Sequence, residues 1–246
     1  MALINSFEKS GNWLFRYRGQ LPVVLFLTAI PVIWFTSTYG MAPDVMLAIT
    51  VGAVVISLTG LVVRAIAIAT TPKGTSGRNT KGQVAESLNT SGIYSCLRHP
   101  LYLGNYMMWI GIVIFTFNVG FTIIVSLAFW LYYERIMFAE EQFLRRKFGD
   151  IYDKWSENVS SFIPYSFRFI RPDLPFSIRN VLKREYNSFV NIFVLFALLD
   201  LFRNYFLSER IYLTDMWIYL SGASGVIWLI VRTIEKRTKW LEVEGR

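Results

Sequence analysis

The chain has 246 residues, of which 54% are hydrophobic and 17% are charged, and its mean hydropathy is +0.40. A soluble domain usually carries about 25% charged residues, so this composition argues against a soluble enzyme and indicates a membrane protein. A single cysteine excludes an intramolecular disulfide. One cysteine and one histidine also supply too few soft ligands for a zinc site, and no metal site is predicted.

Taken in chain order, the sequence predicts an all-α integral membrane protein of about six transmembrane helices. Residues 1–20 mix basic and aromatic side chains, which is typical of a segment that lies along a membrane interface. Six apolar runs follow, each long enough for a helix that crosses a bilayer. The predicted spans are residues 21–39, 45–70, 100–117, 121–138, 188–207 and 212–231.

The loops divide the chain into three predicted parts. Residues 1–70 contain the interfacial segment and two spans. Residues 71–164 contain a polar loop, a helical hairpin and an acidic helix. Residues 165–246 contain an interfacial linker, two further spans and a basic tail.

The placement of the basic residues predicts the orientation in the membrane. Most of the 25 Lys and Arg residues fall before the first span, in the loop 71–99, in the segment 139–187 and after residue 231. By the positive-inside rule, both termini and both long loops are predicted to be cytoplasmic. This topology, with the attraction of basic groups to anionic lipid, accounts for the net charge of +8 without a nucleic-acid partner.

Arg64 is a basic residue inside a predicted span. It lies one to two turns from the end of the second apolar run. One interpretation is an arginine that snorkels to the interface. The other is an arginine that faces the helix bundle and holds an anion.

The polar loop before the third span carries the only histidine and the only cysteine of the chain. The hairpin that follows turns at Asn118 and ends at the acid pair Glu140-Glu141. An Arg-His-Pro at one mouth of a hairpin, with two acids at the other, predicts a site rather than an anchor. The loop enters the span as Gly92-Ile93-Tyr94-Ser95-Cys96-Leu97-Arg98-His99-Pro100-Leu101-Tyr102-Leu103-Gly104-Asn105.

These motifs resemble the signature of the isoprenylcysteine carboxyl methyltransferase family, whose general plan the phospholipid N-methyltransferases share. The resemblance covers about residues 74–164. The turn reads Asn118-Val119 where the family frequently has Asn-Pro, which is a small departure. The ordered motifs are Thr90-Ser91-Gly92-Ile93-Tyr94, Arg98-His99-Pro100-Leu101-Tyr102-Leu103-Gly104, Asn118, Glu140-Glu141-Gln142-Phe143-Leu144, Lys147-Phe148-Gly149-Asp150-Ile151-Tyr152, and Val159 with Ile163-Pro164.

The resemblance implies a multi-pass membrane enzyme that transfers a methyl group from S-adenosyl-L-methionine to a lipidic acceptor, at a site facing the cytoplasm. It also implies an arginine shortly before the acid pair that helps to bind the acceptor, and Arg135 is the nearest candidate. Glu140 and Arg135 are therefore the predicted catalytic residues. The predicted cofactor-binding residues are Glu86, Ser87, Leu88, Asn89, Tyr94, Arg98, His99, Pro100, Leu101, Tyr102, Gly104, Glu140 and Glu141.

The chemistry of this cofactor agrees with the residue types present. A sulfonium and an ammonium need acids, a carboxylate needs hydrogen-bond donors, and adenosine needs aromatic surface. In-line methyl transfer asks the protein mainly for alignment and desolvation. A carboxylate or phosphate acceptor needs no general base, whereas an amine would make a glutamate the candidate base. The acid would be Glu140 or Glu141, the hydrogen-bond donors Arg98 with His99, and the aromatic surface Tyr94 with Tyr102.

The two acids are about 100° apart on a helix, so they cannot point into one pocket in the same way. Glu141 has Arg145 four residues on, which favours a solvated ion pair at the surface. Glu140 has Leu144 at that offset, which favours Glu140 as the site acid. His99 alone is typical of an interfacial helix start, but within the ordered motif it is interpreted as a cofactor ligand.

Two other functions are weighed against this one. A membrane reductase that uses a nicotinamide cofactor is possible because sterol reductases look distantly similar in the hairpin region, although the Glu-Glu-x-x-Leu element speaks against it. A transporter or scaffold would carry polar residues at mid-membrane depth, which the spans nearly lack.

The acceptor stays open among carboxylate, phosphate and amine head groups, and no oligomeric state is predicted. The glycines Gly74 and Gly77, with Arg78 and Asn79, fit either a loop that wraps the cofactor or a flexible linker.

Overall fold

The structure is a computed structural model that describes residues 2–72, 74–75, 82–165 and 168–246. Gly77, Arg78 and Asn79 of the predicted loop lie outside these ranges. The described residues are nearly all helical, as the composition and the apolar runs predict. The helices are α1 (Leu3–Tyr17), α2 (Leu21–Phe35), α3 (Pro43–Ala69), the short 3₁₀ turn η1 (Ile93–Ser95), α4 (Pro100–Ile114), α5 (Val119–Phe148), α6 (Asp150–Ser156), α7 (Ile178–Ser208) and α8 (Asp215–Arg237).

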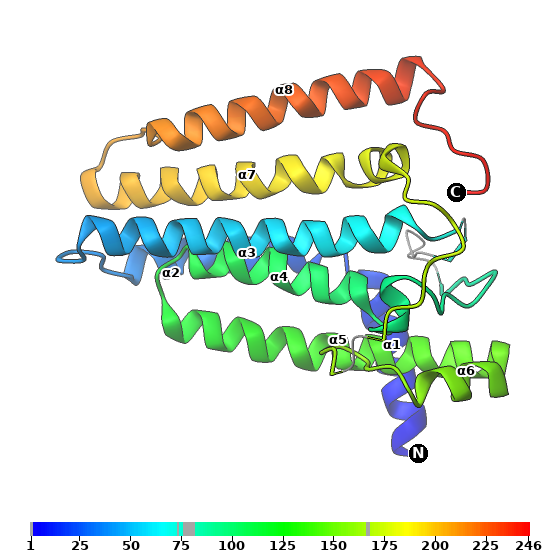
Figure 1. Ribbon diagram of the computed structural model, residues 1–246. Helices are drawn as coiled ribbons and strands as arrows, with labels where there is room; N and C mark the ends of the chain where they lie inside the picture. Colours follow the sequence, from blue (N-terminus) through cyan, green and yellow to red (C-terminus); the bar gives the residue numbers. More distant parts are fainter. Residues whose placement is uncertain (1, 73, 76–81, 166–167) are drawn as a thin grey trace.

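Each of the six predicted spans forms a helix, and these helices run roughly along one axis (Figure 1). Among the described residues, four helices are long and apolar enough to cross a membrane, namely α3, α5, α7 and α8. The pair α1–α2, bent by 75°, could supply a fifth span. Helices α2 and α4 have 15 residues each, or about 22 Å, which is shorter than the roughly 30 Å hydrocarbon core. The multi-pass all-α class is confirmed, whereas six full-length spans are not.

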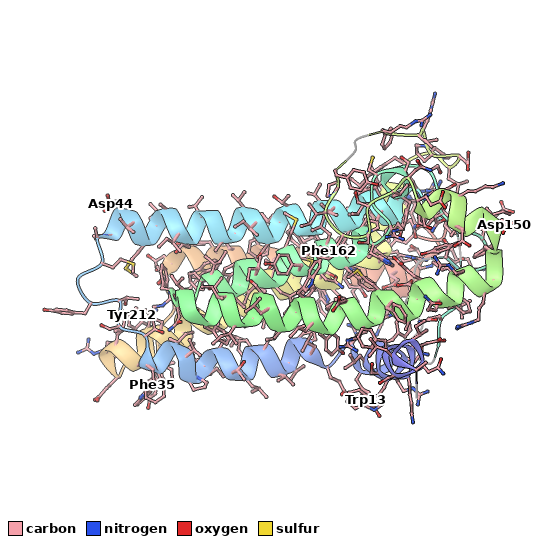
Figure 2. All side chains as sticks on the ribbon, turned by 90° about the horizontal axis from the view of Figure 1, so that it is seen from below. Trp13, Phe35, Asp44, Asp150, Phe162 and Tyr212 are labelled. Atoms are coloured by element: carbon pink, nitrogen blue, oxygen red, sulfur yellow. The ribbon has the colours of Figure 1, made fainter. Side chains whose placement is uncertain are left out.

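The polar segments gather at one end of the bundle, which we call the polar end. It carries α1, residues 82–99, α6 and the C-terminal residues 238–246, and both chain termini lie there (Figure 1). Figure 2 shows Trp13 and Asp150 at this end and Phe35, Asp44 and Tyr212 at the other. The basic segments that the sequence assigns to one side of the membrane therefore lie at one end of the fold.

Helices α3 and α4 approach closely because glycines line their contact. A Cβ built on Gly60 would lie 2.5 Å from the carbonyl oxygen of Gly104 and 2.7 Å from the backbone nitrogen of Met108. A Cβ on Gly104 would lie 2.5 Å from Cγ of Arg64. The Ser57 hydroxyl donates across the same contact to the Met108 carbonyl at 3.0 Å. Small residues at a helix contact let backbones approach in this way in membranes, where apolar burial alone does not drive association.

Helix α1 crosses α5 at the polar end. Gly11 is buried against the Arg135 carbonyl, where a side chain would not fit. The Glu8 carboxylate accepts two hydrogen bonds from the Arg146 guanidinium, at 2.6 and 3.0 Å. The crossing thus fixes the N-terminal segment beside the C-terminal part of α5, whose last turn is basic.

Polar residues at the far end join α7 to the loop before α8. The Asp200 carboxylate accepts from the Asn204 amide at 3.1 Å and from the Thr214 backbone N–H at 2.9 Å. Arg203 is buried beside them, donates to the Phe115 carbonyl and lies over the Phe115 ring. The Asn204 amide and the loop backbone at Thr214 therefore depend on one carboxylate.

We expect Asp200→Ala to lower the free energy of unfolding by about 2 kcal/mol, because it leaves buried donors without an acceptor. Asp215→Ala is the control, since that carboxylate is exposed at the start of α8, after the same loop, and its loss should cost no more than about 1 kcal/mol. Denaturant titration of the two variants in detergent measures the difference. Equal effects would contradict a joining role for Asp200.

Candidate active site

The loop that carries the signature motif, residues 92–99, is called the signature loop below. It is held in place by the segment that follows α6. The backbone N–H groups of Arg98 and His99 donate to the carbonyls of Ser160 and Ser161, at 2.8 and 3.1 Å. The N–H of Gly92 donates to the Ile170 carbonyl at 2.8 Å. Gly92 has a φ of +62°, a conformation that side-chain-bearing residues rarely adopt. Residues 160–161 and Ile170 therefore hold the loop in place through its backbone.

His99 precedes α4 and lies between the two acids of α5. Its backbone is outside the helical region, as expected for a residue before a proline, and Pro100 begins the helix. Nε2 of His99 lies 3.0 Å from Oε1 of Glu141, and Nδ1 lies 3.7 Å from Oε2 of Glu140. An ionised carboxylate only accepts hydrogen bonds, so the Nε2–H donates to Glu141. The imidazole, almost fully buried, is thus positioned from both sides.

The two acids take different places, as their helical offset predicts. Glu140 accepts a hydrogen bond from the Tyr102 hydroxyl at 2.9 Å and faces a cavity. Glu141 lies behind His99 and also accepts from the Arg98 guanidinium at 3.3 Å. The predicted surface pair of Glu141 with Arg145 is wrong. Arg145 instead donates to Asp153 of α6 at 2.7 Å, because α6 folds back beside that face of α5.

A cavity of about 210 Å³, which we call the signature cavity, lies at the polar end. It brings together ten of the predicted site residues from four separate segments of the chain. The remaining four predicted residues, Glu86, Gly104, Arg135 and Glu141, do not line it. The ten are Ser87, Leu88, Asn89, Tyr94, Arg98, His99, Pro100, Leu101, Tyr102 and Glu140.

The four remaining residues have other surroundings. Glu86 is exposed and packs against Gly74, and Gly104 gives room to the side chain of Arg64. Glu141 supports His99 from behind, as described above. Arg135 was expected to reach the acceptor, but its guanidinium lies 3.3 Å from the centre of the Phe7 ring of α1. The α1 crossing, which the sequence does not reveal, takes Arg135 away from the cavity.

The signature cavity also contains residues that the sequence reasoning did not assign. Several of them reach it from parts of the chain that are distant in sequence, so only tertiary structure brings them there. A signal was available for Asn105, which is polar within an apolar run, and for Phe143 and Leu144, which stand in the motif with Glu140 and Glu141. The unassigned residues include Phe15, Arg18, Asn105, Phe143, Leu144, Trp155, Arg184 and Glu185.

Arg64 faces the bundle, so the second interpretation of this residue is confirmed. Its Nε and Nη2 donate to the two carboxylate oxygens of Glu185 on α7, at 2.9 and 2.6 Å. Its Nη1 donates to Oδ1 of Asn105 on α4 at 2.6 Å. The anion that Arg64 holds is therefore a carboxylate of the chain itself, and three helices meet at one guanidinium.

Tyr94 supplies a neutral hydroxyl to the signature cavity. Burial, and then the negative charge of Glu140, raise the pKa of this phenol well above its ordinary value. The hydroxyl therefore stays protonated at physiological pH and is available as a hydrogen-bond donor. No group of three or more His, Cys, Asp or Glu residues that could hold a metal lies in the described ranges.

Comparison with known proteins finds a family that part of this chain resembles. The sequence profile described as phospholipid methyltransferase matches residues 47–151, from α3 to the start of α6. This matched stretch, which we call the family segment, is similar to the phospholipid methyltransferase family. The resemblance read from the signature motifs is thereby confirmed, and the family segment contains most of α3, the signature loop and the acid pair. Helices α7 and α8 lie outside it.

Individual relatives match parts of the chain. The protein-S-isoprenylcysteine O-methyltransferase of Schizosaccharomyces pombe is 35% identical over 77 residues, which are 31% of this chain and 33% of that protein. A probable protein-S-isoprenylcysteine O-methyltransferase of Oryza sativa subsp. indica is 28% identical over 134 residues, or 54% and 63% of the two chains. The nickel-cobalt-cadmium resistance protein NccN of Alcaligenes xylosoxydans xylosoxydans is 32% identical over 83 residues, or 34% and 38%.

The chain thus spans less than two thirds of the length of each of these relatives. No solved structure matches it significantly. The family segment nevertheless holds most of the signature cavity. Phe15 and Arg18 before the segment, and Trp155, Arg184 and Glu185 after it, complete the wall.

Proposed function

We propose that the protein is an integral membrane methyltransferase that moves a methyl group from S-adenosyl-L-methionine to a lipidic acceptor. The observation that carries this proposal is the convergence of Ser87–Asn89, Tyr94, Arg98–Tyr102 and Glu140 on one cavity, within a chain whose residues 47–151 match the phospholipid methyltransferase profile. The names of the isoprenylcysteine O-methyltransferase relatives support the same reaction class.

The donor set of the signature cavity fits this cofactor. Glu140 offers a carboxylate to a cationic group, and Arg98 and Asn89 offer N–H donors to a carboxylate. Tyr94 and Tyr102 offer aromatic surface to a ring or a sulfonium. When bound, S-adenosyl-L-methionine supplies the methyl group as an activated sulfonium.

The residues of the chain have positioning roles in this reaction. His99, fixed between Glu140 and Glu141, holds the two acids apart and orders the start of α4. The Tyr102 hydroxyl fixes the rotamer of Glu140. Preorganised charges in a cavity that excludes water contribute to catalysis because they need not reorganise during the reaction. Glu140 is the titratable acid that faces the reactants.

The proposed orientation places the signature cavity at the cytoplasmic face. The support is the concentration of basic residues at the polar end, where α1, residues 82–99, α6 and the C-terminal residues lie (Figure 1). A soluble cofactor would enter the cavity from that side, while an acceptor dissolved in the bilayer would approach between helices.

Titration calorimetry of the detergent-purified protein with S-adenosylhomocysteine tests the proposal. We expect saturable binding, weakened about tenfold or more by Glu140→Gln and by His99→Ala, because each loses a charge-assisted contact. Glu134→Gln is the matched control, since Glu134 is an exposed acid on the same helix. NADPH is titrated in parallel.

Binding of NADPH without binding of S-adenosylhomocysteine would replace the methyltransferase by the reductase alternative. If neither ligand binds, both the methyltransferase and the reductase function are refuted. The metal-resistance name of the NccN relative has no counterpart among the described residues of this chain, where no three-residue group of metal ligands is found.

A further inference from the structure

The chain between α6 and α7 exposes apolar and basic side chains next to one another. Phe169, Ile170 and Phe176 are 62%, 53% and 57% exposed, although none of them lies in a helix. Exposed apolar side chains of a membrane protein usually belong to helices that face lipid, so their presence on a loop needs another explanation. The patch, which we call the linker surface, consists of Arg168, Phe169, Ile170, Arg171, Phe176 and Arg179.

The linker surface lies where the apolar helices end. The N–H of Ser177 donates to the carbonyl of Ala69, the last residue of α3, at 3.1 Å. Pro172 lies near the signature loop, since its Cβ is 3.4 Å from the place of a Cβ on Gly92. In Figure 2 the chain after Phe162 lies at the side of the bundle, at the polar end. Non-helical backbone cannot face the hydrocarbon core, so this level corresponds to the lipid head groups.

The charges of the linker surface select the kind of head group. Arg168 and Arg171 are exposed, and neither forms an ion pair with an acid in the described part of the chain. Arg179, in contrast, already lies over the Trp240 ring and donates to its carbonyl. Asp173 is the one acid in residues 168–179, which leaves a net charge of +2. Two unpaired arginines beside exposed phenylalanines match a lipid with an anionic head and apolar chains.

Ile170 joins the linker surface to the signature cavity. Its carbonyl accepts from the N–H of Gly92 at 2.8 Å, and its own N–H donates to Oγ of Ser95 at 2.9 Å. These two bonds hold both ends of η1, which carries Tyr94 into the wall of the signature cavity. A contact that fixes the linker against the membrane therefore also fixes Tyr94.

We propose that the linker surface binds anionic phospholipid head groups of the surrounding bilayer, and that this binding tightens cofactor binding in the signature cavity. The second part rests on the proposed function, since it concerns the same cavity. The lipid favours the conformation in which Ile170 bonds to Gly92 and Ser95, and so it raises the population of the ordered loop. By thermodynamic linkage, a bound cofactor strengthens the binding of anionic lipid by the same factor.

The test places the full chain in nanodiscs of phosphatidylcholine alone, or of equimolar phosphatidylcholine and phosphatidylglycerol. Titration calorimetry measures the binding of S-adenosylhomocysteine, whose ammonium and carboxylate balance, so that an anionic surface does not merely concentrate it. Hydrogen exchange, measured without ligand, follows the peptide that contains Gly92 and Ser95. We expect about fivefold tighter binding in the anionic discs, because one arginine near an anionic surface contributes about that factor. Exchange at Gly92 should slow in the same discs, and high salt should reduce both effects.

Paired substitutions assign the effect to the linker surface. Arg168→Gln with Arg171→Gln should reduce the gain to less than about twofold and leave binding in phosphatidylcholine discs unchanged, since neither side chain lines the signature cavity. Arg168→Lys with Arg171→Lys should keep most of the gain, because the charges remain. Lys147→Gln with Lys154→Gln is the matched control. It removes two exposed basic residues of α5 and α6 and should keep the full gain.

The outcomes separate this inference from the proposed function. If S-adenosylhomocysteine binds in neither disc, the proposed function falls, and the exchange at Gly92 alone decides whether anionic lipid binds the linker. Equal binding in the two discs would refute the proposal and leave the methyltransferase standing. A gain without slower exchange at Gly92 would refute the route through Ile170.

Two further results would reassign the effect. An equal loss of the gain in the lysine pair would attribute it to the general charge of the polar end and would refute the linker surface. Soluble glycerol 3-phosphate is added to the phosphatidylcholine discs as a second probe. If it reproduces the gain, the partner is a free anion and the membrane assignment is wrong.

Discussion

Gly60→Ala is expected to lower the free energy of unfolding by about 3 kcal/mol and to weaken S-adenosylhomocysteine binding. The new Cβ would lie 2.5 Å from the Gly104 carbonyl oxygen and 2.7 Å from the Met108 nitrogen. Both are backbone atoms that cannot turn away, so α3 and α4 must separate, and overpacking of this kind costs about 1–3 kcal/mol or more. The separation would also move Arg64 and Asn105, which lie on these two helices.

The control is Gly52→Ala on the same helix. A Cβ at Gly52 meets nothing within 4 Å, so only the helix propensity changes, and alanine is favoured over glycine by about 1 kcal/mol. Gly52→Ala should therefore leave the stability unchanged or raise it. Unfolding in a denaturing detergent series measures both variants. Equal stability of the two would mean that α3 and α4 are not in close contact in the membrane protein.

The sequence determines much of the fold because long apolar runs leave few alternatives to helices in a bilayer. Each of the six predicted segments is helical, and their charged connections gather at one end. The number of full spans could not be obtained in this way. Helix α2 ends at Phe35 and α4 at Ile114, several residues before their apolar runs end, so hydropathy alone overestimates their lengths.

The candidate site was predicted best where its residues are consecutive. Residues 87–89, 94 and 98–102 could be assigned because the motif places them in one loop and one helix start. Arg64 illustrates the limit. Its position in a span marks it as unusual, but its partner Glu185 is 121 residues away and lies in a charged stretch that reads as an interfacial linker. The crossing of α1 over α5 is likewise invisible in the sequence, so the contact of Arg135 with the Phe7 ring could not be predicted.

Glu141→Ala is expected to destabilise the protein by at least about 3 kcal/mol. The substitution removes the carboxylate that accepts from Nε2 of His99 and from the Arg98 guanidinium, both largely buried. Breaking a buried pair by removing one partner leaves an uncompensated charge, which costs about 3–5 kcal/mol. Because His99 then lacks its support, S-adenosylhomocysteine binding should weaken about tenfold as well, although Glu141 does not line the signature cavity.

Arg145→Ala is the comparison that decides whether Glu141 pairs with Arg145 at the surface or lies behind His99. If Glu141 were paired with Arg145 at the surface, the two variants would have the same small effect, because an exposed ion pair contributes at most about 1 kcal/mol. In the structure Arg145 is half exposed and binds Asp153, so Arg145→Ala should change the stability by less than about 1 kcal/mol and leave ligand binding intact. Thermal unfolding and calorimetry on the two variants measure both quantities. A small effect of Glu141→Ala would mean that Glu141 does not support His99, and the assignment of the two acids to separate roles would then be wrong.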